Sequence, residues 1–332
     1  MSRDEQAGEY RPAATEAVHR LEFTVDWPPG HAAAYLIDCE EPVLVDAGVP
    51  GDRGERELTT ALDPLGYGPE DVDHVLVTHP HSDHVGQVTT VLEAGGATIY
   101  APEGIRPRLD RATDDLAAGV RSTAVEAGME GRRADEAVKD AVNSLMRDRN
   151  LLPTEAIDVD LAYGETYEVA GFSVEVIHAP GHQADHACFQ VSGRDGDLMF
   201  AGDMVIEPFR SAALDVGIDR GAYDAVDRFY GTYDRLRGRD VAEVYPGHGP
   251  VFAAYDAAVE SSVADLDGMV EHVYETLADL EPATPVEVGT ERAGEHLTAS
   301  LLDTIGALGH LDGEGRVAYE HTDEGVRQYR TC

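Results

Sequence analysis

Short apolar runs separated by polar turns dominate the N-terminal third of the chain. Runs of this kind, bounded by Gly, Pro and Asp, predict β-strands. Between some of them the apolar positions recur at helical spacing, which predicts helices at Glu55–Leu65 and Val85–Glu93. The predicted strands are Arg20–Val25, Ala33–Cys39, Pro42–Val45, Val72–Val77 and Ala97–Tyr100.

The pattern changes between Pro102 and Pro153, where apolar residues recur at helical spacing through two or three segments. We interpret these helices as an inserted cap. Strands then return, and a single helix interrupts them. The predicted elements are the strands Thr166–Val169, Phe172–His178, Ala187–Val191 and Leu198–Ala201, the helix Ala222–Arg237, and a closing strand in Val244–His248. This order predicts an α/β fold in which two sheets lie between layers of helices.

From Val251 onward the pattern is largely helical. A helix at Glu295–His310, followed by Leu311–Gly315 and a strand at Val317–Glu320, predicts a helix that runs into a β-hairpin. That order is typical of a winged helix-turn-helix. We therefore expect a catalytic domain at 1–254, with the helical insertion at about 102–153, and a winged-helix-like domain at 255–332.

Charge is the most extreme feature of the composition, with 64 acidic against 25 basic residues and a formal net charge of −39. Lys139 is the only lysine. In molar salt the Debye length falls to about 3 Å, so such a surface no longer repels itself strongly. We interpret the charge as adaptation to a salt-saturated cytoplasm, as in an extreme halophile, rather than as a sign of an acidic partner.

Three scattered cysteines predict neither a disulfide framework nor a zinc ribbon. The acidic segment Met1–Tyr10 is unlike a signal peptide, and no run of about 18 apolar residues predicts a membrane span. We expect a soluble, cytoplasmic protein without membrane contacts.

Candidate chemistry begins with the run His79-Pro-His81-Ser-Asp83-His84, which follows a predicted buried strand. His79 and His81 stand two apart on an extended segment, so both side chains leave one face and can bind one metal ion. Asp83 and His84 follow as the chain turns into a helix, so they can face the same cavity and a second metal ion. Imidazole and carboxylate ligands suit zinc.

Three further candidates also follow predicted strands: His182, Asp203 and His248. Each stands beside a glycine, which permits close approach of the backbone. Asp46 ends another strand in the turn Asp46-Ala-Gly48. A lone histidine in such a place is more often structural than a ligand, but the combination favours a metal centre.

Taken in order, these motifs resemble those of the metallo-β-lactamase superfamily over about Leu21–Val251. The resemblance implies an αββα sandwich in which His79, His81 and His182 hold one metal ion, and Asp83, His84 and His248 hold the other. It implies further that Asp203 bridges both ions and that Asp46 orients ligands from behind. Two Zn²⁺ per chain are expected, with iron or manganese as alternatives.

Aspartate rather than cysteine at position 203 resembles the glyoxalase II, lactonase and ribonuclease branches, which disfavours β-lactam hydrolysis. A two-metal site presents hydroxide to an electrophilic carbon or phosphorus, so hydrolysis is the expected reaction. The segment Pro180–His186 is similar to an element of β-lactamase-like hydrolases that carry a C-terminal winged helix. Within it His186 is a candidate proton donor to the leaving group, the alternative being a hydrogen-bonded structural histidine.

The substrate class stays open at this point. The first hypothesis is a small ester, thioester or lactone, held under the 102–153 insertion; that insertion could equally be a packing appendage or a homodimer contact. The second is single-stranded RNA, which the ten acidic residues and four arginines of 281–332 disfavour without excluding. The third is a mononuclear iron enzyme like the persulfide dioxygenases, although the second set of ligands favours two metals.

Overall fold

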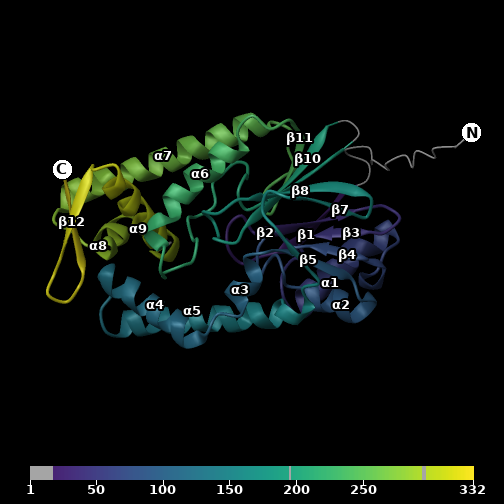
Figure 1. The fold of residues 1–332 in the computed structure, drawn as a ribbon, viewed down its shortest axis with the longest axis horizontal. Coiled ribbons are helices and arrows are strands. Elements are labelled where there is room, and N and C mark those ends of the chain that lie inside the picture. The colour runs from purple at the N-terminus through teal and green to yellow at the C-terminus, as the bar shows by residue number, and fades with distance from the viewer. Residues whose placement is uncertain (1–17, 194–195, 294–296) are drawn as a thin grey trace, which may run out of the picture.

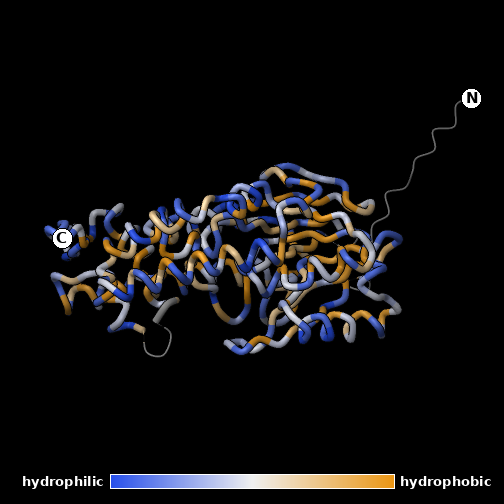
Figure 2. The backbone as a smooth tube through the Cα atoms, turned by 90° about the horizontal axis from the view of Figure 1, so that it is seen from below, coloured by the Kyte–Doolittle hydropathy of each residue, from blue (hydrophilic) through white to orange (hydrophobic). Residues whose placement is uncertain are grey.

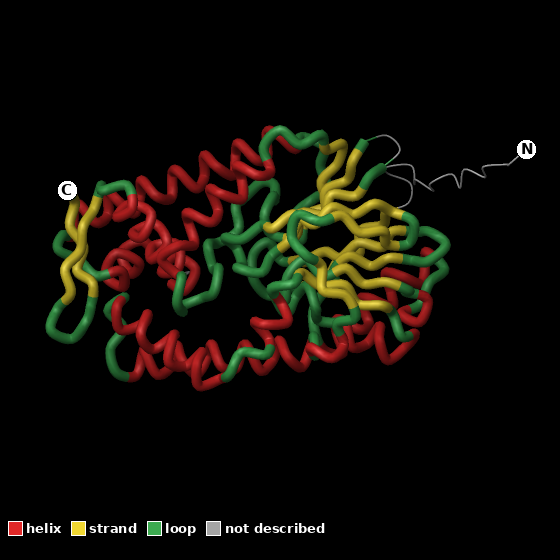
Figure 3. The backbone as a smooth tube through the Cα atoms, in the orientation of Figure 1, coloured by secondary structure: helices red, strands yellow, loops and turns green. Residues whose placement is uncertain are grey.

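Two β-sheets lie face to face in the computed structural model, with helices over both outer faces (Figure 1). The structure describes residues 18–193, 196–293 and 297–332. The strands of the two large sheets gather at one end of an elongated molecule, and helices extend from them to a small hairpin at the other end (Figure 3). No helix within the described ranges is long and apolar enough to cross a bilayer.

The first sheet has six strands in the order β1-β2-β3-β4-β5-β6. The first three pair antiparallel, and β3 to β6 pair parallel. Because parallel neighbours need a crossover, α1 (Gly51–Leu62) joins β3 to β4, and α2 (Val88–Gly95) joins β4 to β5. The strands are β1 Val18–Thr24, β2 His31–Ile37, β3 Val43–Val45, β4 His74–Leu76, β5 Thr98–Pro102 and β6 Val159–Leu161.

The second sheet has the order β11-β10-β9-β8-β7. Its strands pair antiparallel except for β10 and β11, which are parallel and joined through α6 (Ala225–Leu236). The strands are β7 Thr166–Val169, β8 Phe172–His178, β9 Ala187–Val191, β10 Asp197–Gly202 and β11 Val241–Pro246. Short 3₁₀ helices lie at Asp63–Leu65, Pro69–Asp71, Thr154–Ala156 and Ala222–Asp224.

Alternation along the inner strands explains the layering, because successive side chains of a strand point to opposite faces. In β2, Ala33 and Tyr35 pack between the sheets, while Ala34 and Leu36 pack against the helix side of the first sheet. In β10 the same alternation places Phe200 between the sheets. Hydrophobic positions accordingly concentrate along the strands (Figure 2). The αββα arrangement predicted from the sequence is confirmed.

The cap occupies the long crossover between β5 and β6 and contains α3 (Ile105–Leu109), α4 (Thr113–Glu126) and α5 (Arg132–Leu151). The sequence predicted the helices but missed β6, whose three residues are too short to show a period. In Figure 1 the cap runs along one side of the molecule, from the sheets toward the C-terminal hairpin.

The C-terminal part consists of α7 (Tyr255–Leu280), α8 (Pro285–Arg292), α9 (Leu297–Gly313) and the hairpin β12 (Val317–His321) and β13 (Arg327–Thr331). Thr284 and Glu287 form a reciprocal capping box that fixes the start of α8. The predicted start of the last helix, Glu295, lies outside the described residues. Its predicted end at His310 is wrong, since α9 continues through Gly313. The division at 254/255 stays a prediction.

The tip of the cap is joined to the C-terminal part. Arg327 donates hydrogen bonds of 2.9 and 2.6 Å to the Glu126 carboxylate, and its guanidinium lies 3.9 Å from the ring centre of Tyr223. The N–H of Val286 donates to the carbonyl of Ala127 at 3.0 Å. Beneath these contacts lies a small apolar cluster of Ala127, Ala222, Leu301 and Ile305, against which Met129, Ile218, Tyr223 and Val286 pack.

Candidate metal centre

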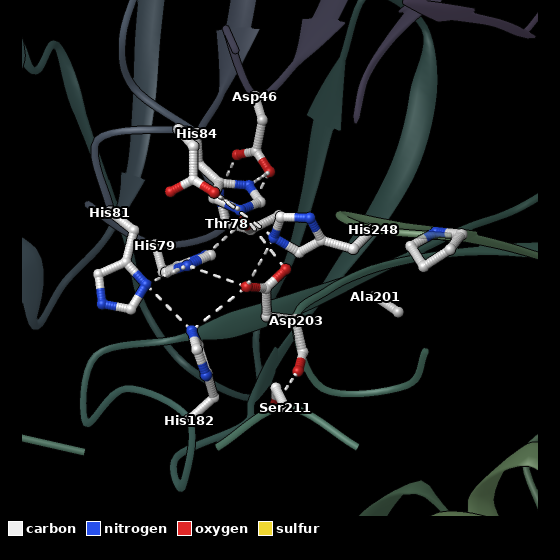
Figure 4. A network of polar contacts seen from close by, with 12 residues as sticks. Asp46, Thr78, His79, His81, His84, His182, Ala201, Asp203, Ser211 and His248 are labelled. Atoms are coloured by element: carbon white, nitrogen blue, oxygen red, sulfur yellow. Dashed lines mark hydrogen bonds and ion pairs between the residues drawn. The ribbon is translucent and has the colours of Figure 1, made fainter. Parts of the chain in front are cut away.

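Each candidate ligand follows the C-terminal end of a strand, and these ends meet at one edge of the two sheets. Asp46 follows β3, and the run from Thr78 to His84 follows β4. From the second sheet, His182 follows β8, Asp203 follows β10 and His248 follows β11. The structure therefore brings together every ligand that the sequence singled out (Figure 4).

A first group of donor atoms is formed by His79, His81, His182 and Asp203. The Nδ1 atom of His81 lies 3.0 Å from His79 Nε2 and 3.0 Å from His182 Nε2. Asp203 Oδ2 lies 3.2 Å from His182 Nε2 and 3.9 Å from His79 Nε2. All four side chains are buried or nearly so. Three ring nitrogens and a carboxylate oxygen thus surround one point.

A second group contains Asp83, His84 and His248. Asp83 Oδ2 lies 3.4 Å from His248 Nε2 and 3.8 Å from His84 Nε2. Asp203 reaches this group too, since its Oδ1 is 3.4 Å from His84 Nε2 and its Oδ2 is 3.4 Å from His248 Nε2. Asp203 therefore lies between the two groups, which is the place of a bridging ligand.

The outer nitrogens of four histidines have oxygen partners that point the inner nitrogens into the site. His182 Nδ1 donates to the carbonyl of Ala212 at 3.1 Å, and His248 Nδ1 donates to the carbonyl of His31 at 2.7 Å. His84 Nδ1 donates to the Asp46 carboxylate at 2.8 Å, and His79 Nδ1 lies 3.0 Å from Thr78 Oγ1. Such partners hold a proton on the outer nitrogen and turn Nε2 toward the site, as around metal-binding histidines.

Asp46 lies behind the second group rather than in it. One of its oxygens accepts from the Thr78 N–H at 2.8 Å, and the other accepts from Thr78 Oγ1 at 2.8 Å and from His84. Asp46 is 3% exposed, and its φ of 59° is unusual for a residue with a side chain. Its carboxylate thus connects to His84 directly and to His79 through Thr78.

Several observations show that metal ions fit these residues. Ligands about 2.0–2.1 Å from a tetrahedral zinc are about 3.3 Å apart, close to the observed separations of 3.0–3.9 Å. Among the described residues, His84 Nε2 and Asp203 Oδ1 are buried and have no hydrogen-bond partner. Buried polar atoms without partners are costly, and a shared cation would satisfy both.

Protonation states point the same way. Burial lowers the pKa of His79 and of His81 well below the usual range, so both rings are neutral ligands. Burial alone would raise the pKa of Asp203, but His248 and His84 hold it well below its usual range. Burial alone would lower the pKa of His248, but the Asp203 carboxylate outweighs it and the pKa rises to about 10. A cation would take the place of the proton that His248 otherwise keeps.

His186 is fully buried beside the first group but is not part of it. Its Nε2 accepts a 3.0 Å hydrogen bond from the backbone N–H of Asp203. This places the ring proton on Nδ1, which has no partner among the described residues. The geometry favours the structural alternative, a histidine that positions Asp203, over the proton-donor hypothesis.

Close approach explains the glycine of Pro246-Gly-His248. A Cβ atom at Gly247 would overlap the Asp203 carboxylate and the His84 ring. At Gly202, whose φ is 47°, a Cβ atom would overlap the His186 ring. Both positions therefore need glycine for the ligands to converge.

A cavity of about 890 Å³ opens beside the metal centre and includes His81 in its wall. The cap contributes one wall, the loops after β8 and β10 contribute another, and α8 and α9 contribute a third. The sequence suggested that the 102–153 insertion covers a substrate pocket, and the structure has a cavity that this insertion helps to line. Apolar lining residues include Leu116, Met129, Leu145, Ile218, Val286, Leu301 and Leu302.

Two polar residues of this wall were not predicted from the sequence. Gln183 is 1% exposed, and neither its amide nitrogen nor its amide oxygen has a partner among the described residues. Asp215 is also 1% exposed and has a φ of 41°. Burial raises the pKa of Asp215 to about 6 although Arg228 contacts it at 2.6 Å. The only available signal was that Gln183 directly follows a ligand.

Comparison with known proteins supports this reading of the site. The model of the metallo-beta-lactamase superfamily matches residues 27–248. A hydroxyacylglutathione hydrolase of Rhizobium meliloti is 24% identical over 258 residues, which cover 75% of this chain and 78% of that protein. An atrochrysone carboxyl ACP thioesterase of Cryptosporiopsis sp. is 22% identical over 267 residues, which cover 80% of this chain. The match spans only 63% of that thioesterase.

Among solved structures, a metallo-beta-lactamase family protein of Thermus thermophilus superposes with a TM-score of 0.75 at 22% identity. The match covers 95% of this chain and 99% of that protein, so the likeness in fold includes the cap and the C-terminal helices. The matched family model covers more than half of the chain, and the two convergent donor groups are consistent with a binuclear metal centre: the chain belongs to the metallo-β-lactamase superfamily.

Proposed function

We propose that this chain hydrolyses an ester or thioester bond of a small-molecule substrate, with two zinc ions held by the two donor groups. The observation that carries the proposal is the position of Asp203 between the groups, next to a cavity whose wall includes His81. The names of two relatives, a thioesterase and a hydroxyacylglutathione hydrolase, support the acyl class. Lactones belong to the same class of electrophile.

Two bound zinc ions supply an activated water near neutral pH and a Lewis acid for the carbonyl oxygen. The residues of the chain provide the geometry for this chemistry. His79, His81 and His182 would hold one ion, and Asp83, His84 and His248 would hold the other, with Asp203 placed between the two groups. Asp46 keeps a proton on the outer nitrogen of His84, and His186 fixes the backbone of Asp203. Asp83 stays ionised because His84 and His248 outweigh its burial and lower its pKa.

Two alternatives are less well supported. The cavity wall carries six carboxylates against three arginines, which disfavours RNA because polyanions need a basic surface. A mononuclear iron enzyme would need only the first donor group, whereas the second group is complete here. Aspartate rather than cysteine at position 203 disfavours β-lactam hydrolysis.

Several finer assignments complete the proposal. The C-terminal helices and hairpin form a winged-helix-like unit that packs on the catalytic region, and its excess of acidic residues disfavours nucleic acid as a partner. The chain belongs with the glyoxalase II-like branch, works in the cytoplasm of a salt-adapted cell, and can form a homodimer. These assignments stay predictions.

The test is metal analysis of the purified chain in molar KCl, combined with turnover of acyl thioesters, p-nitrophenyl esters, lactones and single-stranded RNA. We expect about two zinc ions per chain, loss of acyl hydrolysis on chelation, and its return with zinc. His248→Ala should lose one metal ion and most activity. His74→Ala is the matched control, since His74 lies outside both donor groups and contacts Glu41. One iron with oxygen consumption, or cleavage of RNA alone, would overturn the proposal.

A further inference from the structure

The cavity beside the metal centre extends from His81 to α8 and α9 of the C-terminal part. At about 890 Å³ it is near the upper end of small-molecule sites, which are roughly 300–1,000 Å³. A short acyl group at the metal centre would leave most of this space unfilled. The size of the cavity therefore favours a substrate larger than a short acyl ester, which the donor groups alone do not indicate.

The cap tip, α8 and α9 contribute apolar side chains to the wall of the cavity. Met129 of the cap tip, Val286 of α8 and Leu301 of α9 all line it. The same three residues pack in the small apolar cluster that joins the cap to the C-terminal part. Leu301 and Leu302 are only 4% and 6% exposed. These side chains are therefore held by packing and form part of the cavity wall.

Charge indicates which part of a substrate this space accepts. Arg108 lies 3.6 Å from Asp185, and Arg111 forms an ion pair with Asp219, so two of the three arginines in the wall are already paired. The carboxylates of Glu136 and Asp140 line the same space. A phosphate or carboxylate would meet repulsion there, whereas an uncharged apolar group would not.

We propose that the cavity holds a large uncharged apolar acyl group, and that Leu301 and Leu302 of α9 set the longest group that fits. This inference rests on the proposed acyl hydrolysis and adds the substrate class. With the carbonyl at the metal centre, the acyl chain runs between the cap and α9. The C-terminal part is then a wall of the substrate site, and not only a packed appendage.

The experiment measures kcat/KM for p-nitrophenyl esters and acyl thioesters of increasing chain length with the metal-loaded enzyme. Replacement of Leu302 by Trp should lower kcat/KM for the longest substrates at least ten-fold relative to acetyl esters, since each misfitted methylene costs about ten-fold or more. Leu301→Ala should shift the optimum toward longer chains. Ratios within one variant cancel any loss of folded protein.

Leu308→Ala is the matched control, because Leu308 is fully buried on the same helix but does not line the cavity. It should lower thermal stability and leave the chain-length optimum unchanged. Equal losses for short and long substrates in Leu302→Trp would overturn the proposal, and so would a shift caused by Leu308→Ala. Calorimetric titration with 1-decanol separates this proposal from the hydrolase proposal. Binding to wild type but not to Leu302→Trp would support the apolar site even if no ester were hydrolysed, and equal binding would count against it.

Discussion

Replacing Asp46 by asparagine tests whether the buried carboxylate behind the site controls metal binding. One carboxylate oxygen of Asp46 accepts from the backbone N–H of Thr78, and the other accepts from Thr78 Oγ1 and His84 Nδ1. Asparagine can present an oxygen to only one side. Either orientation therefore places an NH₂ group against a donor.

If the amide nitrogen faces His84, the ring can relieve the clash only by moving its proton to Nε2, which is the nitrogen that faces the second donor group. A protonated Nε2 cannot bind a metal ion. Loss of such an outer-shell partner typically weakens metal binding 10–100-fold, or about 1.4–2.7 kcal/mol. The unpaired buried donor should also lower the free energy of unfolding by about 1–3 kcal/mol.

The assay is zinc titration against a competing chromophoric chelator, followed by metal analysis after dialysis at limiting zinc. Wild type should keep about two ions per chain, while Asp46→Asn should keep about one, because the second donor group loses its oriented histidine. Asp73→Asn is the control, since Asp73 is an exposed aspartate directly before β4. If Asp46→Asn binds two zinc ions within two-fold of the wild-type affinity, the reasoning about the tautomer of His84 is refuted.

Four further predictions concern the surroundings of the site, the junction of the cap and the charge of the whole chain. Asp303 of α9 accepts from the Ala213 N–H at 2.8 Å and from Arg210 at 3.1 Å, and so holds the loop whose Ala212 carbonyl orients His182. Asp303→Ala should therefore loosen this loop and weaken zinc binding severalfold in the same titration, and unchanged affinity would contradict the prediction. Gln183→Leu should leave the melting temperature unchanged or raise it, because the buried amide has no partner among the described residues. It should raise KM, because the amide lies in the wall of the cavity. A lower melting temperature with unchanged KM would indicate a purely structural role. Arg327→Ala should lower the free energy of unfolding by about 1–3 kcal/mol, because Arg327 contacts Glu126 and Tyr223. It should also speed the exchange of backbone amide hydrogens in the cap around Glu126. The same exchange rate as in wild type would mean that these contacts do not hold the cap. The melting temperature should rise steadily between 0.1 and 3 M KCl, because salt screens the net charge of −39; a flat or falling profile would contradict salt adaptation.

The sequence identified the residues that converge in the two donor groups because their signal is local. Each ligand follows a short apolar strand, and strand ends in such a sandwich meet at one edge, so His182 and His248 could be assigned to one site without coordinates. The hydrogen-bond partners of the outer histidine nitrogens could not be predicted from the sequence. The carbonyl groups of Ala212 and His31 carry no side-chain signature, and only the folded chain shows that they fix two histidine rings.

The cavity could not be predicted for a related reason. Its walls come from the cap, two loops and the C-terminal helices, and apolar spacing identified the helices without showing which faces enclose space. Gln183 and Asp215 look like ordinary surface residues in the sequence, since nothing local indicates that both are buried. The role of His186 was ambiguous for the same reason, because its partner is a backbone amide 17 positions away.

The contact between Glu126 and Arg327 has a consequence for how the molecule folds. These residues are 201 positions apart, so their pairing closes a very long loop. Contacts of such separation are slow to form, because the entropy of closing the loop is lost before the contact stabilises anything. The metal centre depends on a contact of the same kind, since His248 Nδ1 donates to the carbonyl of His31, 217 positions away. We therefore expect the metal centre and the closed cavity to form late in folding, in the same stage as the docking of the cap on the C-terminal hairpin.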